Sequence, residues 1–300
     1  MVSYNDKITL INYFRSVAER ELCSIVRSTH DYRKQASKIN TVIKDQKDCT
    51  IDEMLKTARH SRWSNEYVLD CVLHITYASY VVMLEFRNKV WPYEYMAFAR
   101  RIGELWEPFC KETFSYPVKK LRLINPPDFD EVQEDIKRNA SNYINSLSVD
   151  YQTKRLLHYH YSIPWNLVDS GGIQLGLDLH FSQNGINYNC DFKSGFSSNE
   201  KGNTNRLLLV ASIYRFLNQN EKTLLFVRQR EDENNHYLQN LKNSGYWDVF
   251  CADDAYAKMD EFTGFNLRLW LDENATWSDD ISNELYLHLQ NEDLLKYLTW

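Results

Sequence analysis

Three charged residues, Asp178, Asp191 and Lys193, have the types and the spacing needed for metal-dependent hydrolysis. Branched and aromatic residues partly alternate with polar ones over 173–181 and 186–193, and an Asn-Gly pair lies between, which predicts two strands joined by a hairpin turn. Asp191 and Lys193 are two positions apart, so both side chains leave the same face of the second strand. If the strands pair across the turn, Asp178 can approach that face from the first strand.

Two carboxylates and one ammonium group in one small volume suit a magnesium site. Mg²⁺ prefers oxygen ligands, is commonly held by one or two carboxylates, and keeps several of its waters. A lysine beside such an ion can orient or deprotonate an attacking water. We therefore expect Asp178 and Asp191 to hold one or two Mg²⁺ ions and Lys193 to act in catalysis.

With this arrangement the chain resembles the PD-(D/E)xK nucleases, the superfamily that includes most type II restriction endonucleases. The family pattern is an acidic residue on one strand, a short gap, and an acid-any-Lys triplet on the next strand. Here Asp178 is followed, after twelve residues, by the triplet Asp191-Phe192-Lys193. The proline that gives the family its name is replaced by Leu177.

The resemblance implies a Mg²⁺-dependent endonuclease that hydrolyses double-stranded DNA at a specific short sequence. It implies a homodimer that cuts both strands and leaves 5′-phosphate ends. In this interpretation Asp178 and Asp191 hold the metal, while Lys193 aligns the attacking water.

A further carboxylate is expected from a helix that precedes the hairpin. Apolar residues recur every three or four positions over 99–114, which predicts a helix, although Pro108 is expected to kink or restart it. Many members of the family have a glutamate on this helix, often near a glycine, that helps to hold the metal. Gly103-Glu104 resembles this feature, so Glu104 is the expected third ligand and Glu107 the rival; a solvent-exposed helix face is the alternative for either.

The predicted polar loop 194–205 follows the second strand directly, so it is well placed to reach a DNA groove. Three residues of this loop, and the arginine that follows it, are of types that pair with base edges and phosphates. They are Lys201, Asn203, Asn205 and Arg206. The alternative is a solvated loop in which Asn203 or Thr204 caps the next helix.

The order of predicted elements favours an α/β fold with a restriction-endonuclease-like core, in which helices flank a central mixed sheet. The expected elements after the hairpin are a helix at 206–217, a strand at 223–228, a helix at 237–242, a strand at 246–252, a helix at 254–262 capped by Asp253, and a further strand at 265–271. A break at Pro126-Pro127 precedes one more helix at 130–147. We assign residues 93–300 to this core, including an acidic C-terminal extension.

Residues 1–92 differ from the core and predict a helical N-terminal subdomain. Helical periodicity occurs over 8–26, 32–43, 51–60 and 64–86, and no glycine precedes Gly103. This part could contact DNA or a second copy, or it could be a cap that packs on the core.

The composition limits the class of protein. The chain of 300 residues is 43% hydrophobic, without an obvious run of about eighteen apolar residues or a signal-peptide pattern, so we expect no membrane span. Six scattered cysteines favour reduced thiols in the cytoplasm over disulfides or a zinc site. The net charge of −6 is concentrated in residues 251–300, which hold three basic and eleven acidic groups, so residues 1–250 carry +2.

Other motifs give weaker signals. Ser170-Gly-Gly172 lacks the Lys-Ser/Thr ending of a phosphate-binding loop, so it predicts a hinge and no nucleotide cofactor is expected. His158 and His160 have strand spacing that could hold a metal, but a structural or DNA-facing role is the expectation. His180 could lie near the site or be a buried structural histidine.

Two other classes of function stay open. One is a DNA repair, recombination or phage-type nuclease of the same superfamily, or a non-catalytic nucleic-acid-binding protein with that fold. The other is an α/β protein without a nucleic-acid role, in which Asp191 and Lys193 form a surface ion pair.

Overall fold

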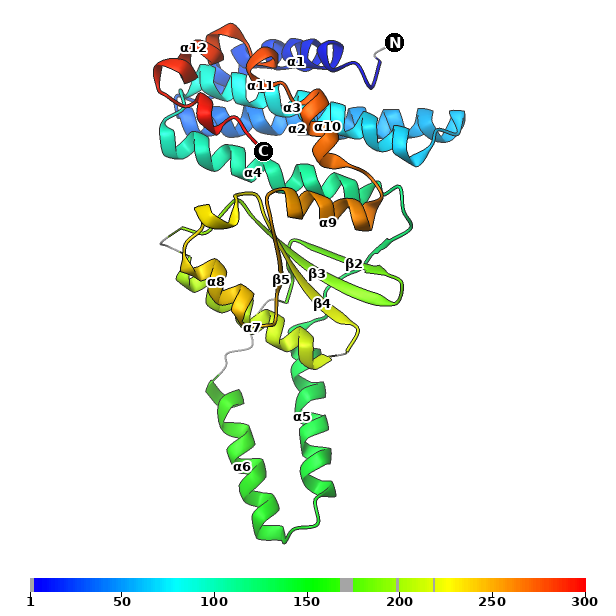
Figure 1. Cartoon of the computed structure of the whole chain (residues 1–300). Coiled ribbons are helices and arrows are strands. Elements are labelled where there is room, and N and C mark those ends of the chain that lie inside the picture. The colour runs from blue at the N-terminus through cyan, green and yellow to red at the C-terminus, as the bar shows by residue number, and fades with distance from the viewer. Residues whose placement is uncertain (1–2, 168–174, 198–199, 218) are drawn as a thin grey trace.

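The computed structural model describes residues 3–167, 175–197, 200–217 and 219–300, and within them the fold is α/β (Figure 1). The strands are β1 (Arg122–Leu123), β2 (Leu179–Gln183), β3 (Ile186–Lys193), β4 (Glu221–Val227) and β5 (Asp248–Cys251). The helices are α1 (Lys7–Ser28), α2 (Tyr32–Ser61), α3 (Asn65–Val90), α4 (Tyr95–Ser115), α5 (Phe129–Ser146), α6 (Tyr151–Leu167), α7 (Lys201–Leu217), α8 (His236–Asn243), α9 (Asp253–Thr263), α10 (Leu267–Asn274), α11 (Trp277–Asp280) and α12 (Asn283–Asn291), with short 3₁₀ turns at Glu231–Glu233 and Leu295–Tyr297.

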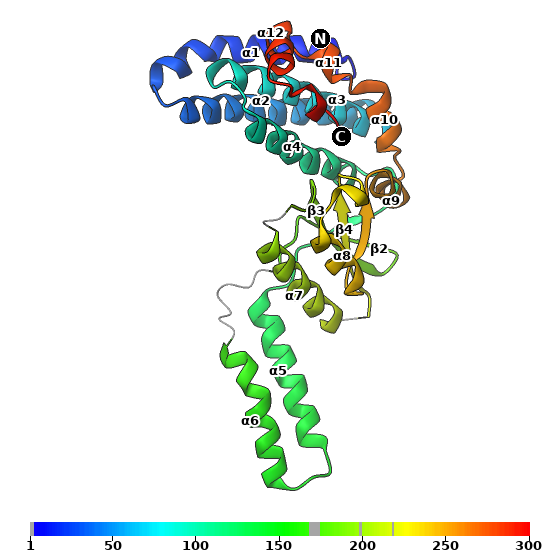
Figure 2. The ribbon, with the colours of Figure 1, turned by 60° about the vertical axis from the view of Figure 1, so that its left-hand side comes forward.

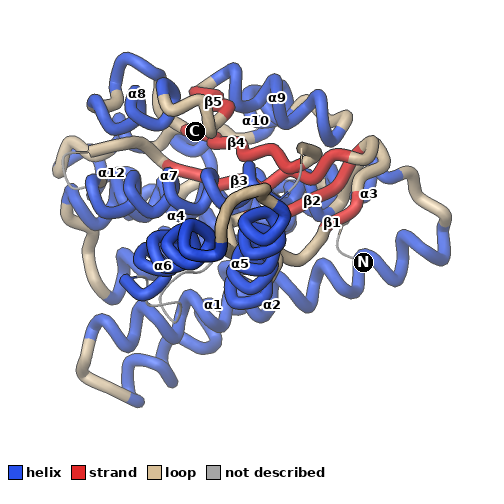
Figure 3. The backbone as a smooth tube through the Cα atoms, turned by 90° about the horizontal axis from the view of Figure 1, so that it is seen from below, coloured by secondary structure: helices blue, strands red, loops and turns tan. Residues whose placement is uncertain are grey.

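The five strands form one mixed sheet in the order β1-β2-β3-β4-β5 (Figure 3). β2 is antiparallel to both β1 and β3, whereas β3, β4 and β5 are parallel to one another. The predicted α/β class with a mixed sheet between helices is therefore confirmed. The restriction-endonuclease-like topology stays a prediction.

The β2–β3 hairpin is fixed by its two-residue turn. Asn184 and Gly185 have positive φ angles of 53° and 80°, as a type I′ turn requires, and Gln183 pairs directly with Ile186. β3 has the predicted bounds. The first strand was expected to begin at residue 173, but β2 begins at Leu179, and residues 175–178 are not part of it. Residues 173 and 174 lie outside the described residues.

Helices cover both faces of the sheet (Figures 1 and 2). On one face, α4 and α9 lie against the sheet: the Trp106 ring of α4 packs edge-on against Phe192, and the Phe262 ring of α9 packs edge-on against Tyr188. A single cluster of buried apolar side chains continues from this face through α4 into α1–α3 and α10–α12. On the opposite face, α7 and α8 enclose a smaller cluster with Leu225 and Val227 of β4. The sheet is thus buried between two helical layers.

The N-terminal segment is helical, as its periodicity predicts. α2 runs unbroken for 30 residues where two helices were expected, because residues 44–50 contain no glycine or proline to interrupt it. Judged by length and composition alone, α3 is the one described helix that could cross a membrane. Most of its apolar stretch is buried inside the protein.

The acidic C-terminal stretch is tied to these N-terminal helices by buried ionic contacts. Asp280 accepts hydrogen bonds from Lys7 Nζ at 2.9 Å and from the Tyr77 hydroxyl at 2.8 Å. Glu85 pairs with Arg15 at 2.6 Å and accepts the backbone N–H of Ser282 at 2.6 Å. Part of the concentrated negative charge therefore neutralises basic groups inside the protein.

Two local predictions are wrong, and of the two outcomes expected at Pro108 the restart does not occur. Residues 265–271 lie mostly in α10, not in a strand, because the Asn266 side chain caps a helix whose buried residues recur at helical spacing. Asp253 does not cap α9 but lies in its first turn, after Ala252 with a φ of 47°. α4 continues through Pro108 without restarting.

The helices α5 and α6 form an antiparallel arm that projects from the body on the side of α7 (Figures 1 and 2). The base of α5 is anchored by Phe129 and Val132, which pack against Val210, Ile213 and Tyr214 of α7. His158 and His160 lie on α6, so the strand spacing expected for them is wrong.

Replacing Gly185 with alanine is expected to reduce the free energy of unfolding by about 1 kcal/mol, because a Cβ is unfavourable at a φ of +80°. The matched control is Gly202→Ala in α7, where no atom from other parts of the described chain lies within 4 Å of an added Cβ. That change should stabilise the protein by roughly 0.5–1 kcal/mol through helix propensity. Urea denaturation measures both, and equal effects of the two substitutions would contradict the role given to the turn.

Candidate active site

The hairpin register brings Asp178 and Asp191 to opposed positions. Leu179 pairs with Cys190, so the next pair outward across the two strands is Asp178 with Asp191. Directly opposed residues of an antiparallel pair share one face, so the two carboxylates lie on the same side as Lys193. Asp178 precedes β2 by one residue and is held there by accepting the Phe192 N–H on Oδ2 at 2.8 Å.

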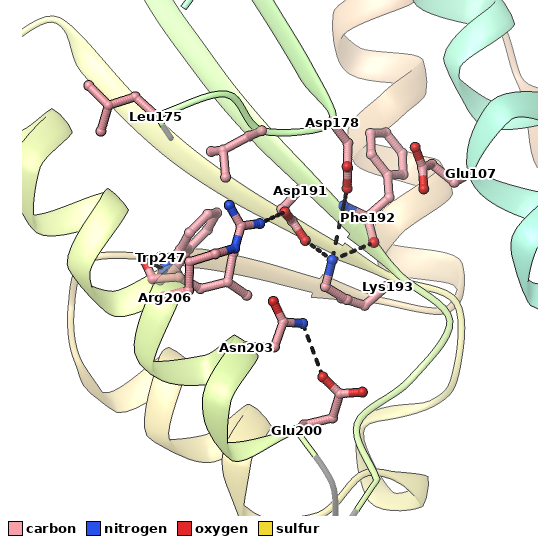
Figure 4. A network of polar contacts seen from close by, with 12 residues as sticks. Glu107, Leu175, Asp178, Asp191, Phe192, Lys193, Glu200, Asn203, Arg206 and Trp247 are labelled. Atoms are coloured by element: carbon pink, nitrogen blue, oxygen red, sulfur yellow. Dashed lines mark hydrogen bonds and ion pairs between the residues drawn. The ribbon is translucent and has the colours of Figure 1, made fainter. Parts of the chain in front are cut away.

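Lys193 lies between the two carboxylates (Figure 4). Its Nζ forms an ion pair with Asp191 Oδ1 and lies 3.9 Å from Asp178 Oδ2. The same ammonium group donates to the Phe192 carbonyl oxygen at 3.1 Å. The three predicted residues therefore share one small, partly enclosed volume, as the spacing in the sequence predicts.

Asp191 is the most buried member of the group, with a side chain that is 0% exposed. Apart from the Lys193 ion pair, its Oδ1 has no hydrogen-bond partner among the described residues, and its Oδ2 lies 3.5 Å from Arg206 Nη2. Burial, together with the negative charge of Asp178, raises the pKa of Asp191 to about 6 against the opposing effect of Lys193. A cation bound here would offset both the cost of burying the ionised Asp191 carboxylate and its repulsion from Asp178.

The two carboxylates fit a hard divalent cation. Asp178 remains 28% exposed and Asp191 is buried, so an ion between them can keep waters on its open side. The buried Asp191 Oδ1, bound only by the Lys193 ion pair, is the atom that fits a metal ligand best. In the described part of the chain, no group of three or more His, Cys, Asp or Glu side chains is arranged to hold a metal.

The helix α4 approaches the end of β3 through Gly103. A Cβ built at position 103 would lie 2.6 Å from Ser194 Oγ, so this close approach requires glycine. Glu107 is one turn after Gly103 and therefore lies on the same side of α4, and in Figure 4 it is on the side of the network where Asp178 lies. Glu104 forms ion pairs with Arg100 and Arg101 at 2.6 and 3.7 Å, and Glu107 forms one with Lys111 at 3.2 Å, so the side of α4 on which each lies is what distinguishes them.

The four predicted DNA-contacting residues lie in the first turns of α7, not in a loop. The helix begins at Lys201, so the expected loop 194–205 is shorter than predicted, and Asn203 and Thr204 are helical residues rather than caps. Arg206 reaches Asp191, and Asn203 donates to Glu200 at 3.0 Å (Figure 4). Lys201 and Asn205 are exposed.

His180 is a structural residue that supports the site. The Leu177 N–H donates to its Nε2 at 2.9 Å, so Nδ1 carries the proton and faces Asn189 Oδ1 at 2.7 Å. Burial lowers the pKa of His180, which favours this neutral form. The ring thus orients the segment that leads to Asp178.

Sequence reasoning missed the link between the site and β4. Arg228, one residue beyond β4, donates from Nε to Ser194 Oγ at 3.1 Å and from Nη1 to the Thr299 carbonyl oxygen at 2.8 Å. Burial lowers the pKa of Arg228. No local motif marks this residue, because its contacts come from distant parts of the chain. The hinge predicted at 170–172 lies outside the described residues.

Comparison with protein-family models, with curated proteins and with solved structures finds no match to this chain. A function therefore has to be argued from the geometry of the site.

The substitution Asp191→Asn is expected to stabilise the metal-free protein at pH 7 by roughly 1–3 kcal/mol. The raised pKa means that the folded state disfavours the ionised carboxylate, so the wild type loses stability as the pH rises from about 4 to about 6. The asparagine variant does not lose stability in this way. The difference in stability between variant and wild type should therefore grow up to about pH 6 and stay constant above it. Thermal melting in EDTA at several pH values measures the difference, and a less stable variant at pH 7 would contradict the electrostatic account.

Proposed function

We propose that this protein is a Mg²⁺-dependent endonuclease that hydrolyses phosphodiester bonds of double-stranded DNA at a specific short sequence, as type II restriction endonucleases do. One observation carries the proposal: Asp178, Asp191 and Lys193 converge at one end of a hairpin, with a buried carboxylate oxygen bound only by the lysine. The combination of two acidic ligands with an adjacent ammonium group is suited to in-line attack of water on a phosphate diester. A purely structural ion pair has no need of the second carboxylate.

In the proposed mechanism each residue has one task. Asp178 and Asp191 hold one or two Mg²⁺ ions, and Lys193 Nζ orients the attacking water and stabilises the negative charge that develops on it. When bound, Mg²⁺ supplies positive charge that polarises the scissile phosphate and stabilises the leaving 3′ oxygen. Arg206, which is 44% exposed and lies beside Asp191, presents its guanidinium to an incoming phosphate.

The helix α7 is proposed as the principal DNA-contacting element. Its first two turns carry Lys201, Asn203, Asn205 and Arg206, and Arg206 links this surface to the catalytic carboxylates. Lysine and arginine contact phosphates or guanine, whereas asparagine pairs with adenine. A homodimer is proposed because cleavage of both strands of a short symmetric site requires two such centres.

Alanine substitution of Asp178, Asp191 or Lys193 is expected to reduce Mg²⁺-dependent cleavage of plasmid DNA by roughly a hundredfold or more, because each removes charge that acts on the transition state. Gel electrophoresis of the products, with Mg²⁺ or with EDTA, measures the effect. The matched control is Glu284→Ala, an exposed carboxylate on α12 that should leave cleavage unchanged.

Far-ultraviolet circular dichroism should show that the three variants remain folded. Full activity in any of them would remove that residue from the site. Discrete fragments from long DNA of mixed sequence would support restriction, whereas progressive or structure-selective degradation would favour a repair, recombination or phage-type nuclease. Binding of DNA without any cleavage would favour the non-catalytic alternative.

The geometry of α4 favours Glu107 over Glu104 as the carboxylate that assists the metal ligands. We expect Glu107→Gln to reduce the cleavage rate about tenfold to a hundredfold, as loss of a supporting contact to a metal does. Glu104→Gln should alter the rate less than about twofold, because surface ion pairs such as those with Arg100 and Arg101 contribute little. Cleavage rates measured across a Mg²⁺ titration compare the two, and a larger defect in the Glu104 variant would reverse the assignment.

A further inference from the structure

We propose that the arm formed by α5 and α6 is the dimerisation surface of this protein, and that it pairs antiparallel with the arm of a second copy. The inference names a surface for the homodimer proposed above and rests on that proposal, but its evidence comes from the arm alone. Figures 1 and 2 show the arm projecting from the body, with its tip far from the sheet.

The arm has almost no core of its own. Phe129 and Val132 are buried at its base against α7. Beyond the base, Ile144 is the one buried apolar residue among the described side chains of α5 and α6. Two helices that share so little buried surface gain little stability from each other, since packing of an apolar face supplies most of the stability of helices in proteins. A covering surface is therefore needed along the arm.

The arm instead exposes apolar residues. Seven of the nineteen large hydrophobic side chains that are exposed in the described chain belong to the segment 129–167. On α6, Leu156, Tyr159 and Ile163 follow at intervals of three and four residues, with exposures of 52%, 63% and 39%. This spacing aligns them in one stripe along the helix. An exposed apolar stripe of this kind marks a protein-binding surface.

Charge is divided along the arm. The base, residues 128–138, has five acidic and two basic residues, whereas the remainder, residues 139–163, has two basic residues, Lys154 and Arg155, and one acidic residue, Asp150. Within the arm, Arg138 forms an ion pair with Asp135. In the described chain, no ion pair neutralises Glu131 or Glu134 at the base, or Lys154 or Arg155 near the tip.

This division of charge selects a second, antiparallel arm as the occupant. In a two-fold dimer each contact occurs twice, so a surface must be complementary to itself. Parallel arms would place basic tip on basic tip, whereas antiparallel arms place each basic tip on the acidic base of the other copy. Base and tip are separated by about fifteen helical residues, or roughly 22 Å, which leaves the α6 stripe between the two charged contacts.

The test is an exchange of charges. A tip variant, Lys154→Glu with Arg155→Glu, and a base variant, Glu131→Lys with Glu134→Lys, should each raise the dissociation constant of the dimer by roughly tenfold or more through like-charge contacts. An equimolar mixture of the two variants should recover the dimer, because the reversed tip then meets the reversed base. Leu156→Glu with Tyr159→Glu should also dissociate the dimer, and mixing should not rescue it.

Sedimentation velocity of the full-length chain in metal-free buffer measures the mass, so the result is independent of whether the protein cleaves DNA. Circular dichroism confirms that each variant keeps its helix content. The proposal is overturned if the wild type is monomeric throughout the concentration series, or if the mixture of charge variants fails to recover the dimer. It is equally overturned if the tip variant keeps the wild-type mass but loses affinity for a DNA duplex, since the arm would then contact nucleic acid.

Discussion

The geometry of the candidate site depends on the two-residue turn at Asn184 and Gly185. Because the turn has positive φ at both positions, Gln183 faces Ile186, and every later pair across the hairpin follows from that contact. Five steps along from the first pair, Asp178 and Asp191 are opposed. A slip of one residue would move one of the carboxylates to the face that packs on Trp106 and Phe192, where an ionised group could not be accommodated.

The surrounding helices keep this short hairpin in place. α4 fills the apolar face through Trp106, while α7 covers the opposite face and brings Arg206 to Asp191. α4 in turn packs into the cluster that α1–α3 share with the C-terminal helices. The helical N-terminal part and the acidic C-terminal part therefore act together as the support on which the sheet and its charged residues rest.

Much of this could be predicted from the sequence, for local reasons. The Asn-Gly turn and the alternation of residues 186–193 predict the hairpin and the bounds of β3, and the spacing of Asp191 and Lys193 predicts their common face. The start of α7 could not be predicted, because its first residues are glycine, asparagine and lysine, which are typical of loops. The position of Glu107 depends on how α4 rotates over the sheet, and the contact between Gly103 and Ser194 that reveals this rotation is non-local.

The ammonium of Lys193 has a further consequence for the chemistry proposed here. It lies where two negative groups would otherwise repel each other, so the folded protein already contains its own counter-ion. Uptake of a divalent ion is then an exchange of one cation for another, and the displaced lysine needs a new anionic neighbour. If the proposed function holds, a phosphate of the substrate would provide one. Binding of the metal and binding of the nucleic acid should therefore strengthen each other, so the affinity for metal should be lower when no substrate is bound.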